Sequence, residues 1–249
     1  MKTGSVGQVC VEKEKNMEKK TVITWIKRVA VYLIGMFLIA FGSNVAIESD
    51  LGVSPVNSIP LVLSLRFPTL TLGTWVTIIF SLFVLVQLVM LRKDFKWYYI
   101  FQFAVSTVFG WFVDGTAVLS AIIFPNTEIY ILRIVYVLVS IVFIAAGILL
   151  YLEGDIMSMP AEGVTVAMTK VFKKPLSTCK LIFDVTIVLI AVILSFVFFA
   201  QLSGVREGTV MIAIGVGVVM KPLAKWCKKP LHTFVFGKTE NEKRDGAGS

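Results

Sequence analysis

The chain has 249 residues, of which 57% are hydrophobic and only 16% are charged. Soluble domains carry about 25% charged residues, so this composition, with a mean hydropathy of +0.85, excludes an ordinary soluble protein and indicates a membrane protein. Three widely spaced cysteines and one histidine, His232, do not suit a disulfide framework, a zinc cluster or a histidine-based catalytic or haem site. We therefore expect no cofactor, no metal and no enzyme.

The net charge of +8 lies in the two ends of the chain. Residues 1–28 carry seven basic and three acidic side chains, residues 221–249 carry the same numbers, and the segment between them carries ten of each. Basic segments stay on the cytoplasmic side of a membrane, so we expect both termini there. The tails, 1–27 and a disordered 226–249, are expected to contact anionic lipid headgroups. Neither has the apolar content of a folded module, so nucleic acid is not an expected partner.

Six apolar stretches are long enough to cross a bilayer as helices, which takes about 20 residues. They are residues 29–47, 72–91, 97–123, 131–152, 181–200 and 208–223. The first follows a basic run, as a signal peptide does, but its length and its lack of a small-residue cleavage site predict a retained span. These stretches predict an all-α polytopic membrane protein with a single transmembrane domain over residues 28–225.

Two shorter segments, 54–67 and 159–172, follow the first and the fourth span. At ~1.5 Å per residue each helix reaches only about 21 Å, less than the ~30 Å hydrocarbon core. Both segments could be re-entrant, which gives six crossings, or tilted and buried, which gives eight. Six crossings place more of the basic loop residues in the cytoplasm, so charge and length favour six.

The two halves resemble each other at a spacing of 105 residues. The most informative identities are Arg28 with Arg133, Gly42 with Gly147, Glu48 with Glu153, Asp50 with Asp155, and Pro55 with Pro160. They predict two repeats of about 105 residues, near 28–125 and 131–225, each with three full spans and one short helix. Repeats that cross three times are inverted, as in many secondary transporters, whereas repeats that cross four times are parallel.

Each short segment begins near a proline, Pro55 or Pro160, with Ser54 or Ser158 as a candidate cap. Proline suits the first helical turn, where its missing N–H costs nothing, and serine is a common cap. The positive end of such a half-helix can bind a ligand within the membrane domain. The side chains two positions beyond the prolines, Asn57 and Glu162, are the best candidates for substrate contact.

Other acidic side chains have two interpretations. The Glu-x-Asp pairs at 48–50 and 153–155 follow helix ends, and they are either solvated interfacial groups or two mouths of a proton or cation pathway. Asp184 either pairs with Lys180 one turn earlier or belongs to the pathway. Asp114, if buried, needs a partner such as Arg133 or Arg206. The candidate pathway residues are Glu48, Asp50, Ser54, Pro55, Asn57, Asp114, Glu153, Asp155, Pro160, Glu162, Asp184 and Arg206.

Three segments resemble the YczE/YitT-like group of bacterial integral membrane proteins. They are the turn Asp50-Leu51-Gly52-Val53-Ser54-Pro55, its counterpart at 155–163, and Gly204-Val205-Arg206-Glu207-Gly208-Thr209 before a glycine-containing helix. The resemblance covers about residues 28–225, and the second turn departs from the group's pattern at Ser158-Met159-Pro160-Ala161-Glu162. It implies a multi-pass protein of the bacterial inner membrane, without the soluble C-terminal domain of longer members. It implies no particular substrate.

The duplicated architecture predicts a small secondary transporter or exporter that works by alternating access. An unidentified small molecule would bind between the two half-helices, and the carboxylates leave coupling to protons or other cations open. The alternative is a membrane accessory or regulatory protein of the same fold. A channel ranks third and an intramembrane enzyme fourth. A homodimer is compatible with the sequence, although no interface is readable from it.

Overall fold

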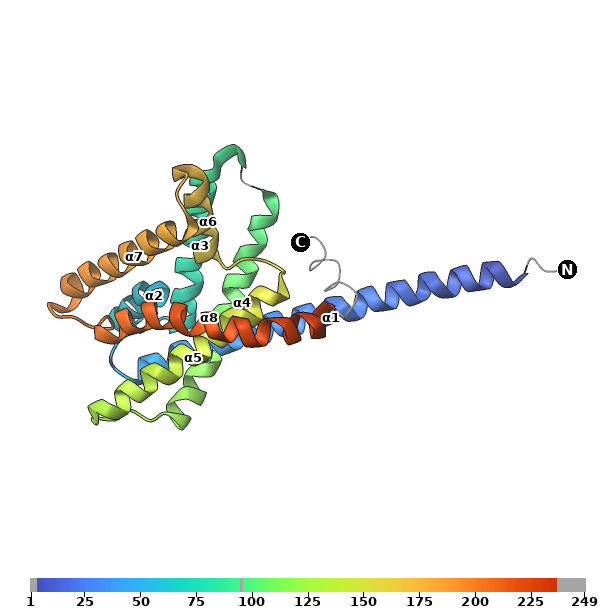
Figure 1. Cartoon of the computed structure of the whole chain (residues 1–249). Helices are drawn as coiled ribbons and strands as arrows, with labels where there is room; N and C mark the ends of the chain where they lie inside the picture. Colours follow the sequence, from blue (N-terminus) through green and yellow to red (C-terminus); the bar gives the residue numbers. More distant parts are fainter. Residues whose placement is uncertain (1–3, 95, 237–249) are drawn as a thin grey trace.

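The computed structural model describes residues 4–94 and 96–236, and it describes only the backbone of residues 4–21, 93, 228–230 and 232–236. All regular secondary structure in the described residues is helical (Figure 1), which confirms the all-α prediction. Two 3-10 helices, η1 (Arg92–Asp94) and η2 (Trp97–Phe101), connect α3 to α4. The α-helices are α1 (Gly4–Glu48), α2 (Pro55–Arg66), α3 (Leu72–Leu91), α4 (Gln102–Ile123), α5 (Tyr130–Gly154), α6 (Pro160–Phe172), α7 (Leu176–Phe199) and α8 (Glu207–Phe236).

Six of the described helical segments are long and apolar enough to cross a membrane. They are Val22–Glu48, Leu72–Leu91, Trp97–Ile123, Tyr130–Gly154, Leu176–Phe199 and Glu207–Cys227. Two spans begin earlier than the sequence predicted: the first at Val22 instead of residue 29, and α7 directly after Pro175 instead of at residue 181. Lys180 does not end this span, because its ammonium group bonds the Asp184 carboxylate one turn later. The short helices α2 and α6 have 12 and 13 residues.

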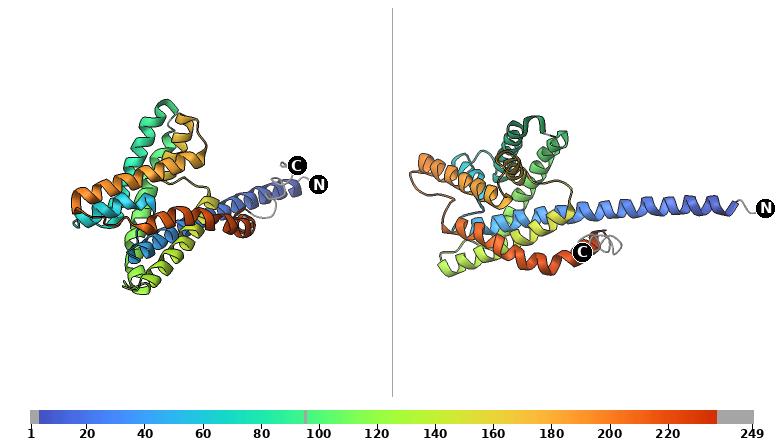
Figure 2. Two further views of the ribbon diagram at one scale, coloured as in Figure 1. Left: turned by 60° about the vertical axis from the view of Figure 1, so that its left-hand side comes forward. Right: turned by 45° about the horizontal axis from the view of Figure 1, so that its top comes forward.

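Parts of both basic tails are helical. α1 begins at Gly4 and therefore runs through most of the predicted N-terminal tail. Figures 1 and 2 show this part of α1 extending away from the other helices. α8 continues to Phe236, so residues 226–236 are helical where the sequence suggested disorder. The rest of that tail lies outside the described residues.

The centre of the fold is an antiparallel pair of helices, α1 and α5. At one end of the pair, Nε of Arg28 in α1 donates to the carbonyl of Gly154, the last residue of α5. Halfway along, the two backbones touch at Gly35 and Gly147, where a Cβ on either residue would lie 2.7 Å from the other's carbonyl oxygen. α4 packs against α1, and α8 packs against α5. The pair therefore carries one long helix on each flank.

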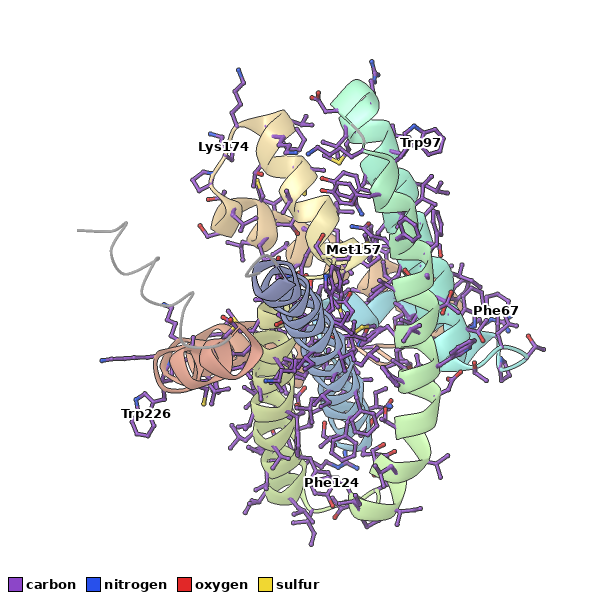
Figure 3. The ribbon with its side chains drawn as sticks, turned by 90° about the vertical axis from the view of Figure 1, so that its right-hand side faces the viewer. Phe67, Trp97, Phe124, Met157, Lys174 and Trp226 are labelled. Carbon is purple, nitrogen blue, oxygen red and sulfur yellow. The ribbon has the colours of Figure 1, made fainter. Side chains whose placement is uncertain are left out.

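The two short helices pack against spans from the opposite halves of the chain. α2 contacts α7 and α6 contacts α3, and each also contacts the span that follows it. Pro55 and Pro160 occupy the first turns of α2 and α6, as the sequence predicts. The caps differ from the prediction, because Ser54 makes no side-chain cap and Met159, not Ser158, precedes α6. Figure 3 shows Trp97 and Lys174 at one end of the bundle and Phe124 at the opposite end.

The contact between Gly35 and Gly147 predicts that the effect of a Gly→Ala substitution on stability depends strongly on its position. Gly147→Ala should lower the free energy of unfolding by about 1–3 kcal/mol, because its methyl group meets backbone atoms of α1 that cannot move aside. Gly217→Ala in α8 is the matched control, since a Cβ there meets nothing within 4 Å. The melting temperatures of the two variants in the same detergent measure the difference. Equal melting temperatures would contradict a tight α1–α5 contact.

Candidate functional site

A cavity of about 150 Å³ lies where the N-terminal ends of α2 and α6 meet, and we refer to it as the central cavity. Ser54, Pro55 and Asn57 reach it from the start of α2, and Met159 and Glu162 reach it from the start of α6. The rest of its wall is mainly apolar and comes from the long helices. These wall residues include Ile39, Phe80, Phe109, Ile144, Ile148, Ile212 and Val216. The cavity thus combines a hydrophobic wall with a few polar groups at two helix starts, as small-molecule sites do.

A second, wider cavity of about 670 Å³ adjoins the first, and we refer to it as the vestibule. Both cavities are lined by Glu162, Lys180 and Asp184, so this cluster stands where they meet. The vestibule extends to the turn before α6, to Tyr98 near the start of α4 and to Leu176 at the start of α7. A solute in the vestibule would therefore pass the charged cluster to enter the central cavity.

The charged cluster contains two carboxylates and one ammonium group. Nζ of Lys180 lies 2.6 Å from Oδ1 of Asp184, which is the local ion pair that the sequence suggested. The carboxylate of Glu162 accepts a hydrogen bond from the Tyr151 hydroxyl, which also accepts one from the backbone N–H of Met159 at 2.8 Å. Among the described residues, no basic side chain lies within 4 Å of the Glu162 carboxylate. With Glu162 ionised, the cluster has a net charge of −1.

Asn57 supplies the polar group on the α2 side of the central cavity. Its side chain is only 6% exposed, and its Nδ2 donates to Oγ of Ser43 at 3.0 Å. Its Oδ1 is the buried side-chain acceptor that has no hydrogen-bond partner in the described part of the chain. An unpaired buried acceptor costs about 1–3 kcal/mol. A ligand that donates a hydrogen bond to Oδ1 would remove this cost.

Two buried glutamines hold the start of α6 in place. Nε2 of Gln87 in α3 donates to Oε1 of Gln102 in α4 at 2.9 Å and to the carbonyl of Pro160 at 3.1 Å. Nε2 of Gln102 in turn donates to Oγ of Ser158 at 3.4 Å. Both side chains are almost completely buried. Neither glutamine is among the residues predicted from the sequence, although a glutamine in a long apolar segment is a visible signal.

The turn between α1 and α2 is fixed to the start of α8. Oδ2 of Asp50 lies 3.0 Å from Nη1 of Arg133 and 3.3 Å from Nη1 of Arg206. The Leu51 carbonyl accepts from the Gly208 N–H at 2.7 Å. Gly52 has a φ of +121°, which strongly favours glycine. Asp50 and Arg206 therefore hold this turn against the rest of the protein and do not line either cavity.

Asp155, the counterpart of Asp50, has a weaker contact. Its Oδ2 lies 3.5 Å from Nη2 of Arg28, and its side chain is 84% exposed. It lines the vestibule, whereas Glu48 and Glu153, near the ends of α1 and α5, line neither cavity. Glu153 is buried and Glu48 is half-buried. The two Glu-x-Asp pairs thus lie at the ends of the central helix pair and not in the central cavity.

Asp114 has a different partner from those that the sequence suggested. Its Oδ1 accepts from the backbone N–H of Gly73 and its Oδ2 accepts from the Thr71 hydroxyl, both at 2.7 Å. Asp114 therefore caps the first turn of α3, and the suggestion that it pairs with Arg133 or Arg206 is wrong. The reason is that α3 packs against α4, so that the N–H groups of the first turn of α3 lie beside Asp114 and need an acceptor.

The central cavity thus brings together Ser54, Pro55, Asn57, Glu162 and Asp184 from the predicted set. Pro160 starts α6 beside it. No group of three His, Cys, Asp or Glu side chains in the described residues could hold a metal ion.

One protein family has a sequence model that matches residues 26–225. The chain belongs to DUF6198. It is a family of unknown function, and the DUF6198 match includes all residues that line the two cavities. A comparison with curated proteins and with solved structures finds no match.

The contacts of Asp114 predict a role in stability. Asp114→Ala should lower the free energy of unfolding by about 1 kcal/mol, the usual cost of losing a helix cap. Asp114→Asn should cost less, because an amide oxygen can still accept from the Gly73 N–H. Glu128→Ala in the exposed α4–α5 connection is the control. A melting temperature that is unchanged in Asp114→Ala would show that Asp114 does not act as this cap.

Proposed function

We propose that the protein is a small secondary transporter or exporter that moves a small solute by alternating access. The observation that carries this proposal is the central cavity, where the starts of two short helices meet beside Asn57, Glu162 and the Lys180–Asp184 pair. Binding sites at the starts of broken helices are typical of secondary transporters. Coupling to protons or another cation would use the same carboxylates.

Contacts of the kind expected from an inverted repeat support this proposal. Arg28 coincides with Arg133 in the 105-residue register, and Asp50 coincides with Asp155. In the fold, each arginine pairs with the aspartate of the other half. Two further pairs of elements begin 105 residues apart, namely α2 with α6 and α4 with α8. These reciprocal contacts are what a twofold axis through the α1–α5 pair would produce.

The antiparallel packing of α1 and α5 also favours six crossings. Neighbouring spans that run in opposite directions have an even number of crossings between them. α3 and α4 supply two crossings if α2 is re-entrant, whereas a crossing by α2 as well would make α1 and α5 parallel. With the basic N-terminus in the cytoplasm, the α3–α4 and α6–α7 connections lie on the cytoplasmic side. Trp97 and Lys174, which belong to these connections, lie at the same end in Figure 3.

In this topology the structure corresponds to an inward-facing state. The vestibule is lined by Tyr98 and Leu176, which lie at the cytoplasmic ends of their helices. The opposite side is closed by the turn that Asp50 fixes to Arg133 and Arg206. Opening toward the outside would require these ion pairs to break. We propose that the protein resides in a bacterial inner membrane, as the resemblance to YczE/YitT-like proteins implies, with both termini cytoplasmic, as the basic tails favour.

Alternating access predicts that the central cavity can be reached from both sides of the membrane. In a variant without native cysteines, Val56→Cys should react with a membrane-impermeant maleimide in right-side-out and in inside-out vesicles. Val166→Cys is the control, because Val166 lines only the vestibule and should react from the cytoplasmic side alone. Asp50→Asn should raise the rate of outside labelling at position 56 several-fold, since it weakens the outer closure. Labelling from one side only would favour the accessory-protein alternative.

The topology has a separate test. Asp94→Cys in the α3–α4 connection should react only from the cytoplasmic side, and Glu128→Cys in the α4–α5 connection only from outside. Both positions are exposed, so access does not depend on the transport cycle. Labelling of Asp94→Cys only from outside would contradict six crossings and indicate eight.

A further inference from the structure

We propose that the central cavity binds a small organic cation with a single positive charge, namely a protonated amine whose apolar part is about as large as benzene. This inference rests on the proposed transport function, because it names the class of solute that the same site accepts. It depends on four features of the cavity: its charge, its unpaired acceptor, the state of its two helix starts and the size of its apolar wall.

The charge of the site favours a monovalent cation. Lys180 bonds Asp184 at 2.6 Å, so these two groups neutralise each other. Glu162 lies at the boundary of both cavities, and the Tyr151 hydroxyl is a neutral donor to it. A buried carboxylate without a cationic partner is costly in apolar surroundings. One ammonium group beside Glu162 would balance the charge of the site.

The unpaired acceptor favours a ligand that donates hydrogen bonds. Oδ1 of Asn57 lacks a partner, while its Nδ2 is already bonded to Ser43. An ammonium group has up to three N–H donors and no acceptor. Asn57 and Glu162 line the same cavity, so a ligand with an ammonium group meets both an unpaired acceptor and a carboxylate there.

The two helix starts are poorly prepared to bind an anion. In α2, Pro55 has no N–H and the N–H of Asn57 is bonded to the Ser54 carbonyl at 3.0 Å. In α6, the N–H of Met159 is bonded to the Tyr151 hydroxyl. Glu162 stands in the first turn of α6, where its negative charge offsets the positive end of the helix dipole. Three of the N–H groups that an anion could use at these helix starts are thus absent or already bonded.

The apolar wall sets the size of the ligand. A cavity of about 150 Å³ lined by aliphatic and aromatic side chains holds a molecule such as benzene. The rings of Phe80 and Phe109 are stacked, with centroids 5.5 Å apart, and form one side of the wall. Aromatic faces also attract ammonium groups. A ligand with a ring-sized apolar part and one charged head therefore fits the apolar wall with its ring and the polar groups with its head.

The test compares three probes of similar shape on the full chain in lipid nanodiscs: benzylammonium, neutral benzyl alcohol and anionic benzoate. Isothermal titration calorimetry should give the tightest binding for benzylammonium, with empty nanodiscs as the background. Glu162→Gln should weaken benzylammonium binding at least about tenfold, or 1.4 kcal/mol. Asn57→Ala should weaken it several-fold, and Glu128→Gln, at an exposed position, should leave it unchanged.

Some results would overturn the inference. These are tighter binding of benzoate than of benzylammonium, no detectable binding of benzylammonium, or equal benzylammonium affinity in Glu162→Gln. If Glu162→Gln does not give monodisperse protein, the same comparison in Asn57→Ala decides. Failure of the transport proposal is distinguishable, because two-sided labelling of the cavity does not depend on which probe binds. Binding of benzylammonium without two-sided labelling would support the cation site and contradict transport. Binding of benzoate together with two-sided labelling would support transport and contradict the cation site.

Discussion

The close antiparallel contact of α1 with α5 is the constraint on which the remaining structure depends. Gly35 and Gly147 let the two backbones touch, so the helices form a single central unit. α4 and α8 pack along its flanks. The turns at its two ends lead directly into the short helices α2 and α6. The position and direction of each short helix therefore follow from how α1 and α5 are aligned.

The candidate site is a consequence of this alignment. Because α1 and α5 run in opposite directions, their C-terminal ends deliver α2 and α6 from opposite ends of the pair. The two short helices then point their starts at one cavity near the middle, where Ile39 and Ile144 line the wall. The Gln87–Gln102 network fixes α6, and the bonds from Gly208 and Arg206 fix the turn before α2. The polar groups of the cavity are thus held in place by the packing of the long helices around it.

The sequence predicted the helices and the location of the site because the relevant signals are local. Apolar length defined the spans, and the prolines marked the starts of α2 and α6 correctly. Asn57 and Glu162, chosen by their distance from those prolines, do line one cavity. The roles of other polar residues depend on partners far away in the chain. Asp114 caps α3, 41 residues earlier, and no local pattern reveals this contact.

The roles of charged residues also depend on contacts that the sequence pattern does not reveal. Lys180 looked like the boundary of the fifth span, but it lies inside α7 and belongs to the cavity wall. The Glu-x-Asp pairs allowed two interpretations, solvated interfacial groups or a pathway; Asp50 holds a turn and Asp155 lies at the exposed rim of the vestibule. Neither pair contributes a residue to the central cavity. Burial and partners therefore decide what each acid does, and the sequence pattern alone does not reveal them.

Crosslinking within intact membranes tests the antiparallel α1–α5 pair most directly. The variant Arg28→Cys/Asp155→Cys, without native cysteines and with a protease site in the connection between α4 and α5, is treated with a short bifunctional thiol reagent and then cleaved. The two halves should stay joined on a denaturing gel, because these positions face each other. In Arg28→Cys/Arg133→Cys, which places the cysteines at opposite ends of the pair, they should separate. The reverse result would mean that α1 and α5 are parallel, which would contradict the antiparallel pair at the centre of the fold.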